Sequence, residues 1–241
     1  MTSSSPLAVV LLHGAWHGPW CWEAVESELA ARGITTHAPA LPSTAGDPAD
    51  LGGFDDDVAA VHATLDRSGP AVVCAHSYAG LVAGAVTHPA LHRLVFLSAF
   101  VADTDETWAD VAAGDGEEGQ GGLADAIAVT DDGYVVVDPA RAVDLFYADC
   151  DPAAAATAVA RLSPQNPEPF TRTMPRPSWR SVPSTFVVCE HDRAISPARQ
   201  RALGARTGAT ITLPTSHSAM LARPDLVADV LEAEARSEPR A

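Results

Sequence analysis

A serine at position 77 stands between an apolar run and a run of small residues, within the stretch 72–80. A strand that turns sharply into a helix, with serine at the turn, exposes the serine hydroxyl for nucleophilic attack. Such turns usually carry glycine two residues before and two residues after the serine, whereas this chain has Ala75 and Ala79. Because alanine is the smallest chiral residue, we expect the turn to survive. We therefore predict that Ser77 is a nucleophile and not only a helix cap.

A serine nucleophile needs a histidine base and a carboxylate that orients the base. His217 lies in the loop after the last expected strand, and Asp192 lies in the loop after the strand before it. Both loops follow the carboxyl ends of strands, so both should lie at the same sheet edge as Ser77. Glu190 and Asp103 also follow expected strands, and they are the alternatives for the acid. The order serine, acid, histidine favours Asp192 and His217 as the partners of Ser77.

The oxygen of an attacked carbonyl group gains negative charge and needs N–H donors. One donor should be Tyr78, whose amide begins the helix after the nucleophile. The second should be Ala15, in the loop after the first expected strand, where a His-Gly pair lets the backbone turn inward. Among the other histidines, we interpret His76 and His191 as buried structural residues. The sequence thus predicts a complete acyl-transfer site.

The elements that must position these residues follow a regular alternation. Apolar runs of strand length alternate with helical patterns, which predicts an α/β fold with a mostly parallel sheet of about six strands and helices on both faces. The expected strands are 7–12, 34–38, 71–75, 94–99, 185–189 and 210–213. The expected helices are 21–32, 54–65, 78–87, 197–206 and 224–235.

Residues 103–183 interrupt the alternation. Asp132 and Gly133 stand between apolar arms and predict a β-hairpin over 129–137. Before the hairpin we expect a mobile Gly/Glu-rich stretch at 114–122. After it we expect two short helices, at 140–150 and 152–162, and then an irregular proline-rich run at 164–183. So long an insertion is too large for a plain loop in a compact domain.

We interpret the insertion as a lid. It should lie over the C-terminal edge of the sheet, where ligands of open α/β sheets bind. The predicted division is a core of 7–102 and 184–236, a lid of 103–183, and flexible termini of 1–6 and 237–241. We expect an apolar substrate pocket between the core and the lid. Its predicted lining residues are Gly14, Trp16, Trp20, Trp108, Phe146, Tyr147 and Trp179, and Phe170 is a further lid aromatic.

The chain resembles the α/β-hydrolase fold family, in particular its compact branch of hydroxynitrile lyases, methyl-ester esterases and related bacterial esterases. The resemblance rests on HGAWHGPWCW at 13–22, AHSYAG at 75–80, EHDRAI at 190–195 and HSAMLARP at 217–224. It covers the expected core and is loose across the lid. It implies Ser77, Asp192 and His217 as a catalytic triad, with Ala15 and Tyr78 as the N–H donors of an oxyanion hole.

Two positions separate the activities within that family. The cyanide-releasing lyases carry a lysine directly after the catalytic histidine and a threonine in the oxyanion loop, where this chain has Ser218 and Gly14. A departing cyanide anion would have no cation beside it, so the resemblance favours a carboxylesterase. The alternatives are a carbon–carbon lyase or cyclase that uses the triad as acid–base machinery, a perhydrolase, and a binding protein without turnover.

Charge and composition exclude other functions. The chain has 31 acidic and 15 basic residues, giving a formal charge of −16, and none of its basic residues is lysine. This excludes Schiff-base chemistry on lysine and argues against binding nucleic acid or an anionic membrane. The four cysteines and the His13/His17 pair match no metal motif, so we expect no metal and no cofactor. The N-terminus carries no export signal, which predicts a cytoplasmic protein acting on a small molecule; a homodimer is kept as an alternative to a monomer.

Overall fold

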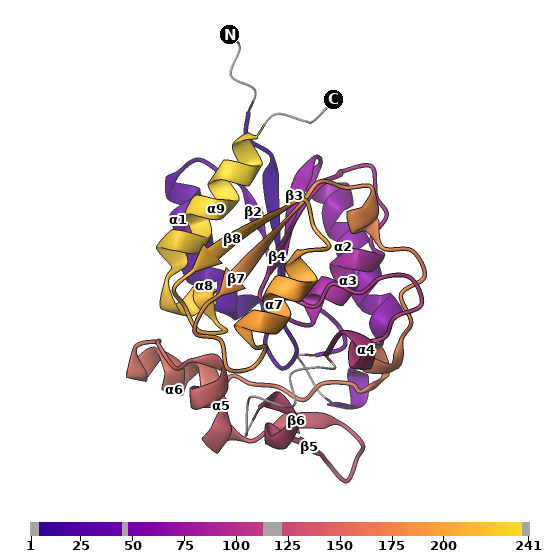
Figure 1. Cartoon of the computed structure of the whole chain (residues 1–241), viewed down its shortest axis with the longest axis vertical. Coiled ribbons are helices and arrows are strands. Elements are labelled where there is room, and N and C mark those ends of the chain that lie inside the picture. Colours follow the sequence, from indigo (N-terminus) through magenta and orange to yellow (C-terminus); the bar gives the residue numbers. More distant parts are fainter. Residues whose placement is uncertain (1–4, 45–47, 113–121, 238–241) are drawn as a thin grey trace.

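The protein is described here by a computed structural model, which places residues 5–44, 48–112 and 122–237 (Figure 1). Residues 114–121 of the expected mobile stretch, and the outermost residues of both expected flexible termini, lie outside the described residues. None of the described helices is both long enough and apolar enough to cross a membrane.

The described part of the chain contains a six-stranded sheet in the order β2-β1-β3-β4-β7-β8, and every neighbouring pair is parallel. The strands are β1 (Ala8–Leu12), β2 (Thr36–His37), β3 (Ala71–His76), β4 (Leu91–Leu97), β7 (Ser184–Cys189) and β8 (Ala209–Leu213). The predicted fold class is confirmed. The second strand is much shorter than expected, because only Thr36 and His37 pair with β1.

Side chains that alternate along the strands fill two cores, one on each face of the sheet. Val9 and Leu11 of β1 belong to the core under α1 and α9, whereas Val10 and Leu12 belong to the core under α2, α3 and α7. The helices around the sheet are α1 (Glu23–Ala31), α2 (Phe54–Ser68), α3 (Ala79–Ala85), α7 (Pro197–Gly204), α8 (Ala219–Ala222) and α9 (Pro224–Arg236). A 3₁₀ turn, Pro19–Trp22, precedes α1, so that helix begins later than predicted; a second such turn, Pro48–Asp50, precedes α2.

Part of the 103–183 segment folds beyond the carboxyl ends of the strands, where Figure 1 shows β5, β6, α5 and α6 grouped together, and its last residues run back along the core to the start of β7. Strands β5 (Ile127–Val129) and β6 (Val135–Val137) form the predicted antiparallel hairpin, whose turn contains Gly133 with a φ of 87°. The helices of the segment are α4 (Trp108–Ala112), α5 (Pro139–Phe146) and α6 (Pro152–Ala160). The proline-rich run also forms short 3₁₀ turns, Glu168–Thr171 and Ser178–Arg180, and each directly follows a proline, Pro167 and Pro177 respectively.

Candidate active site

Ser77 occupies the sharp turn that the sequence predicted. It follows β3 directly and has a φ of 54°, a backbone conformation that non-glycine residues adopt only where the surroundings enforce it. The turn brings α3 against the next loop, and a Cβ on Gly80 would lie only 2.2 Å from the carbonyl oxygen of Phe100. Ala75 and Ala79 are both completely buried, so the turn accommodates two alanines in place of the usual glycines.

Backbone strain gathers around this turn. Among the described residues, the non-glycine residues with positive φ are Trp16, Ser77, Ser98 and Asp105. Trp16 lies in the loop after β1 and Ser98 directly follows β4, so the first three belong to neighbouring strand ends. Strained residues persist only where packing and hydrogen bonds hold them, and they are common at functional sites.

His217 and Asp192 form a buried pair. The Nδ1 atom of His217 lies 2.8 Å from Oδ2 of Asp192, and both side chains are almost completely excluded from solvent. The other carboxylate oxygen of Asp192 accepts the backbone N–H groups of Ala194 at 2.7 Å and Ile195 at 3.0 Å. These bonds fix the carboxylate, which in turn fixes the imidazole ring.

The two alternative acids, Asp103 and Glu190, form ion pairs with arginines. Asp103 forms two hydrogen bonds with the guanidinium group of Arg180, which holds the pKa of Asp103 below its usual value. Glu190 pairs with Arg201. Of the three carboxylates considered from the sequence, the structure places Asp192 against His217.

Two further side chains support Asp192, and the sequence analysis missed both. The hydroxyl of Ser98 donates to Oδ2 of Asp192 and lies 3.3 Å from Nδ1 of His217. The Nε2 atom of Gln200, on α7, donates to the same carboxylate oxygen at 2.8 Å, while its Oε1 atom accepts the backbone N–H of Cys189 at 2.8 Å. Neither residue belongs to a recognisable sequence motif.

The imidazole of His217 lies beside the serine turn. Its ring centroid is 4.5 Å from that of His76, the residue before Ser77, and 5.5 Å from that of Phe146. Within the part of the chain that the structure describes, no hydrogen bond joins the Ser77 hydroxyl to His217 directly. In unliganded enzymes this contact is often long and shortens when substrate binds. The acid–histidine pair is therefore assembled, and the serine stands next to it.

Ala15 and Tyr78 both contribute to the cavity beside Ser77. Among the described residues, neither of their backbone N–H groups has an acceptor within the protein. The carbonyl of the Gly14–Ala15 peptide is held by Nδ1 of His13 at 3.0 Å, and the carbonyl of Ala15 by Nδ1 of His17 at 2.8 Å. The loop after β1 thus has its carbonyl groups paired and an N–H group free.

The two histidines of this loop are neutral. Burial lowers the pKa of His13 to about 4 and that of His17 to about 3. Their remaining ring nitrogens accept hydrogen bonds, from the Leu41 N–H at 3.1 Å and from the Tyr147 hydroxyl at 2.7 Å, respectively. They anchor the loop and do not form a metal site with other residues of the described chain.

Of the two histidines that were predicted to be buried, one is buried and the other is exposed. His76 is buried as predicted, and its Nδ1 atom donates to the carbonyl of Leu97 at 3.0 Å. The prediction that His191 is buried is wrong, because the loop after β7 turns it to the surface while it turns Asp192 inward.

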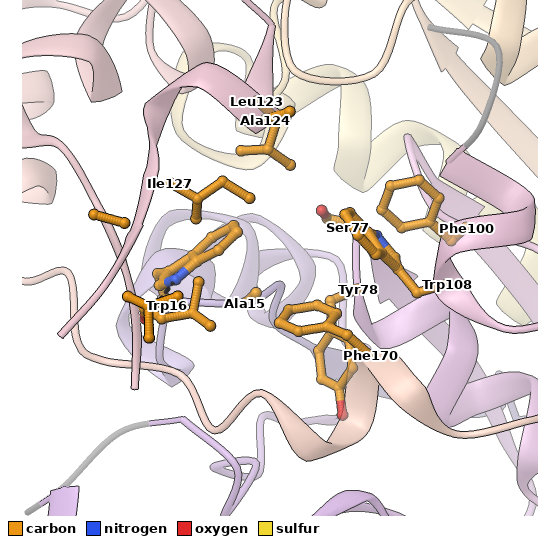
Figure 2. A pocket seen from close by; sticks show the side chains of 13 residues that line it. Ala15, Trp16, Ser77, Tyr78, Phe100, Trp108, Leu123, Ala124, Ile127 and Phe170 are labelled. Atoms are coloured by element: carbon orange, nitrogen blue, oxygen red, sulfur yellow. Dashed lines mark hydrogen bonds between the residues drawn. The ribbon is translucent and has the colours of Figure 1, made fainter. Parts of the chain in front are cut away.

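A cavity of about 300 Å³ opens above Ser77. Figure 2 shows the Ser77 hydroxyl beside it, with Trp16 on one side and Phe100 and Trp108 on the other. Among the described residues, its lining contains no carboxylate, guanidinium or imidazole side chain. The lining residues are Ala15, Trp16, Ser77, Tyr78, Phe100, Trp108, Leu123, Ala124, Ile127, Ala128, Val129, Val135 and Phe170.

Only Trp16 and Trp108 of the seven predicted pocket residues line this cavity. Gly14 lies behind the site, where a Cβ would come within 3.0 Å of the Ser77 Cβ. Trp20 stacks on the ring of His17 instead.

The other three predicted residues also turn elsewhere. Phe146 packs between Trp16 and His217, and Tyr147 donates its hydroxyl hydrogen bond to His17. Trp179 donates its indole N–H to the carbonyl of Ala102 at 2.9 Å. The cavity is instead lined by Phe100, Phe170 and residues of the hairpin. Of these, the sequence analysis had named only Phe170, as a lid aromatic.

Comparisons with known proteins agree with this architecture. A family model described as the alpha/beta hydrolase family matches residues 9–230. The protein named alpha/beta hydrolase nvfD, from Aspergillus novofumigatus, is 23% identical over 239 residues, covering 91% of this chain and 93% of that protein.

Solved structures are similar over nearly the whole chain. A pyrethroid hydrolase from Sphingobium faniae has a TM-score of 0.83 at 24% identity, covering 97% of this chain and 98% of the other. Polyneuridine aldehyde esterase has a TM-score of 0.76 at 17% identity, covering 94% of this chain and 98% of the other. At such identities the similarity establishes a shared fold.

Proposed function

We propose that this chain, which belongs to the alpha/beta hydrolase family, is a serine esterase that cleaves neutral, largely apolar carboxylic esters. One observation carries the proposal. The Ser77 hydroxyl opens into an apolar cavity next to the buried His217–Asp192 pair, and two unpaired backbone N–H groups line the same cavity.

In the proposed reaction, His217 takes the proton of Ser77 as the serine oxygen bonds to the ester carbonyl carbon. The carbonyl electrons move onto the oxygen, where the N–H groups of Ala15 and Tyr78 hold the negative charge. Asp192 stabilises the charged imidazole. When the carbonyl re-forms, the bond to the alcohol oxygen breaks and that oxygen takes the proton from His217. The product of this half-reaction is an alcohol and an acyl-enzyme.

Water completes the cycle. His217 removes a proton from the water molecule, whose oxygen attacks the acyl carbon and forms a second oxyanion. Collapse of this intermediate breaks the bond to Ser77, which regains its proton from His217, and the carboxylic acid leaves. No metal or cofactor takes part in these steps.

The cavity supports the choice of substrate. Its walls are aromatic and aliphatic, so an ionised group on the substrate would lose its hydration without gaining a partner. Apolar acyl or alcohol groups, aromatic ones included, are therefore favoured. The 103–183 segment supplies Trp108, Phe170 and the hairpin residues to this cavity, which supports its proposed role as a lid.

A panel of 4-nitrophenyl esters, from acetate to benzoate, tests the activity together with an alkyl fluorophosphonate. We expect ester turnover, covalent labelling at Ser77, and a loss of at least about 10⁴-fold in kcat for Ser77→Ala. Labelling at another residue would contradict the assignment. Turnover of a carbon–carbon substrate that survives Ser77→Ala and consumes no water would instead support the lyase or cyclase alternative.

A further inference from the structure

The strongest unexplained feature is a buried carboxylate that is hydrogen-bonded to a residue of the cavity lining. Asp57, on α2, has no exposed surface, although an ionised carboxylate is costly to bury without partners. It accepts three hydrogen bonds: from the Ser43 N–H at 2.8 Å, the Ser43 hydroxyl at 2.5 Å and the Tyr78 hydroxyl at 2.6 Å. Two of these bonds come from a loop and the third from the residue after the nucleophile.

Tyr78 joins this carboxylate to the cavity. Tyr78 is one of the residues that line the cavity, its backbone N–H is one of the two unpaired donors, and its hydroxyl reaches Asp57. Burial raises the pKa of Tyr78, so the phenol stays protonated and acts as the donor in this bond. The residue is thus held by its side chain while its N–H stays free.

The peptide that carries this N–H is held from its other end by the Ser77 carbonyl, which accepts the backbone N–H groups of Gly80 and Phe100, both at 3.1 Å. The Tyr78 hydroxyl bond to Asp57 adds a side-chain anchor to these backbone contacts. Helix α3 has the sequence AGLVAGA, so it packs closely but offers few large side chains as anchors. The preceding Ser77 has its strained φ of 54°, which the surroundings must maintain. The longest side chain at this helix start is that of Tyr78, and the atom at its end is fixed by Asp57.

The same network reaches the hairpin. The Gln165 side chain donates to the Ser43 hydroxyl at 2.9 Å, and the Gln165 backbone exchanges two hydrogen bonds, both 2.9 Å, with Val135 of β6. Val135 in turn lines the cavity. Hydrogen bonds therefore run without a gap from the hairpin through Ser43 and Asp57 to Tyr78.

We propose that Asp57 is a positioning residue for the reaction: through the Tyr78 hydroxyl it fixes the backbone N–H that stabilises the oxyanion. This inference rests on the proposed esterase function. It assigns an effect on acylation to a carboxylate outside the His217–Asp192 pair, which acts through the position of the Tyr78 N–H group.

The test compares Asp57→Asn, Tyr78→Phe and the double variant, using stopped-flow acylation by 4-nitrophenyl acetate. Rates are expressed per active site, counted by fluorophosphonate labelling of Ser77, so misfolded molecules do not contribute. A lost oxyanion donor costs about 10²–10³-fold, so a displaced one should lower kcat by about 10-fold, with KM changed less than about threefold. Because both residues act through one bond, the double variant should lose no more than the worse single variant.

Asp55→Asn is the matched control. It makes the same chemical change in the first turn of the same helix, but Asp55 is exposed and pairs with Arg172 at the surface. Exposed ion pairs contribute little to stability, so this variant should retain the parent rate.

Three results would overturn the inference: parent acylation rates per site in both single variants, a change confined to KM, or additive losses in the double variant. If Asp57→Asn fails to fold, Tyr78→Phe decides alone through its kcat. Failure of the parent protein to react at Ser77 would overturn the proposed function instead, so the two failures are distinguishable.

Discussion

The two sides of the cavity differ in the elements and interactions that form them. The core face, consisting of Ala15, Trp16, Ser77, Tyr78 and Phe100, lies at strand ends and rests on a dense set of buried hydrogen bonds. The cap face, consisting of the lining residues between 103 and 183, presents apolar side chains from a helix, a hairpin and a proline-rich turn. Under the proposed function, the core face supplies the reacting groups in fixed positions, whereas the cap face supplies shape.

Under the proposed function, this difference separates the residues that carry out the chemistry from those that select the substrate. Parallel strands bring their carboxyl ends to one edge, so the residues that follow them must meet there. The cap face has no such constraint, and its residues can change with little effect on the hydrogen bonds beneath. Substitutions on the core face should therefore change kcat, and those on the cap face should change KM.

After the loss of Ser77 itself, the largest effect is expected at Asp192. Asp192→Asn keeps the shape of the side chain but removes the charge that orients His217, so kcat should fall by about 10³–10⁴-fold. Steady-state turnover of 4-nitrophenyl acetate measures this. Asp103→Asn should stay near the parent rate, since Asp103 pairs with Arg180. A severe loss in Asp103→Asn with little loss in Asp192→Asn would reverse the assignment of the acid.

A smaller effect is expected at Ser98. Ser98→Ala removes one donor to the buried Asp192 carboxylate, and a hydrogen bond to a charged group is worth about 1.5–3 kcal/mol. Part of that loss should appear in catalysis, as a fall in kcat of about 10-fold at constant KM. Ser181→Ala, which removes a half-buried hydroxyl bonded to the Ser178 carbonyl, is the comparison and should leave kcat unchanged. Equal kcat values in the two variants would show that the bond to Asp192 has no part in catalysis.

The cap face should respond differently. Trp108 packs against Phe170 with ring centroids 5.2 Å apart, and Trp108→Ala removes an aromatic wall. The KM for 4-nitrophenyl benzoate should rise about 10-fold, since burying an aromatic group is worth a few kcal/mol, of which part is lost. Turnover of the acetate ester should change less than about twofold. Trp179→Ala, outside the cavity, should leave both KM values at parent levels, and a rise there would revive the lining predicted from the sequence.

The last prediction concerns the dependence of folding stability on pH, for which we expect the smallest effect on activity. His13 and His17 are neutral when folded, with pKa values lowered to about 4 and about 3, whereas in the unfolded chain they take up protons near pH 6.5. The unfolded state therefore binds more protons as the pH falls. Each group should lower the free energy of unfolding by up to about 1.4 kcal/mol per pH unit between about 6.5 and its folded value.

Thermal unfolding at pH 7, 6 and 5 measures this dependence. The Tm should fall across the series, and the fall should be smaller in His17→Gln. His191→Gln replaces an exposed imidazole and should follow the parent curve. A parent Tm independent of pH over this range would mean that these imidazoles do not resist protonation.

The sequence predicted the core face far better than the cap face. The positions of Ser77, Asp192 and His217 followed from residue type and from their place after strands, because the sheet leaves few ways to arrange them. Ser98 and Gln200 could not be found that way, since a serine or glutamine that orients a carboxylate has the same local sequence as one at the surface.

On the cap face, the cavity lining differs from the predicted one for another reason. Aromatic type indicated burial for Phe146, Tyr147 and Trp179 but not the direction in which each would pack. That direction depends on the path of the whole 103–183 segment. Tyr147 turns toward His17 and Trp179 toward the Ala102 carbonyl, leaving the hairpin aliphatics to line the cavity.

One residue of the core face is hydrogen-bonded to the hairpin. Trp16 lies in the strained loop of the core face, yet its indole N–H donates to the carbonyl of Val135 in the hairpin at 3.0 Å. Any shift of β6 away from the sheet would break this bond and admit water to the indole ring. The fluorescence emission of Trp16 should therefore report displacement of the hairpin. It can be measured without an attached dye once the other tryptophans are replaced by phenylalanine.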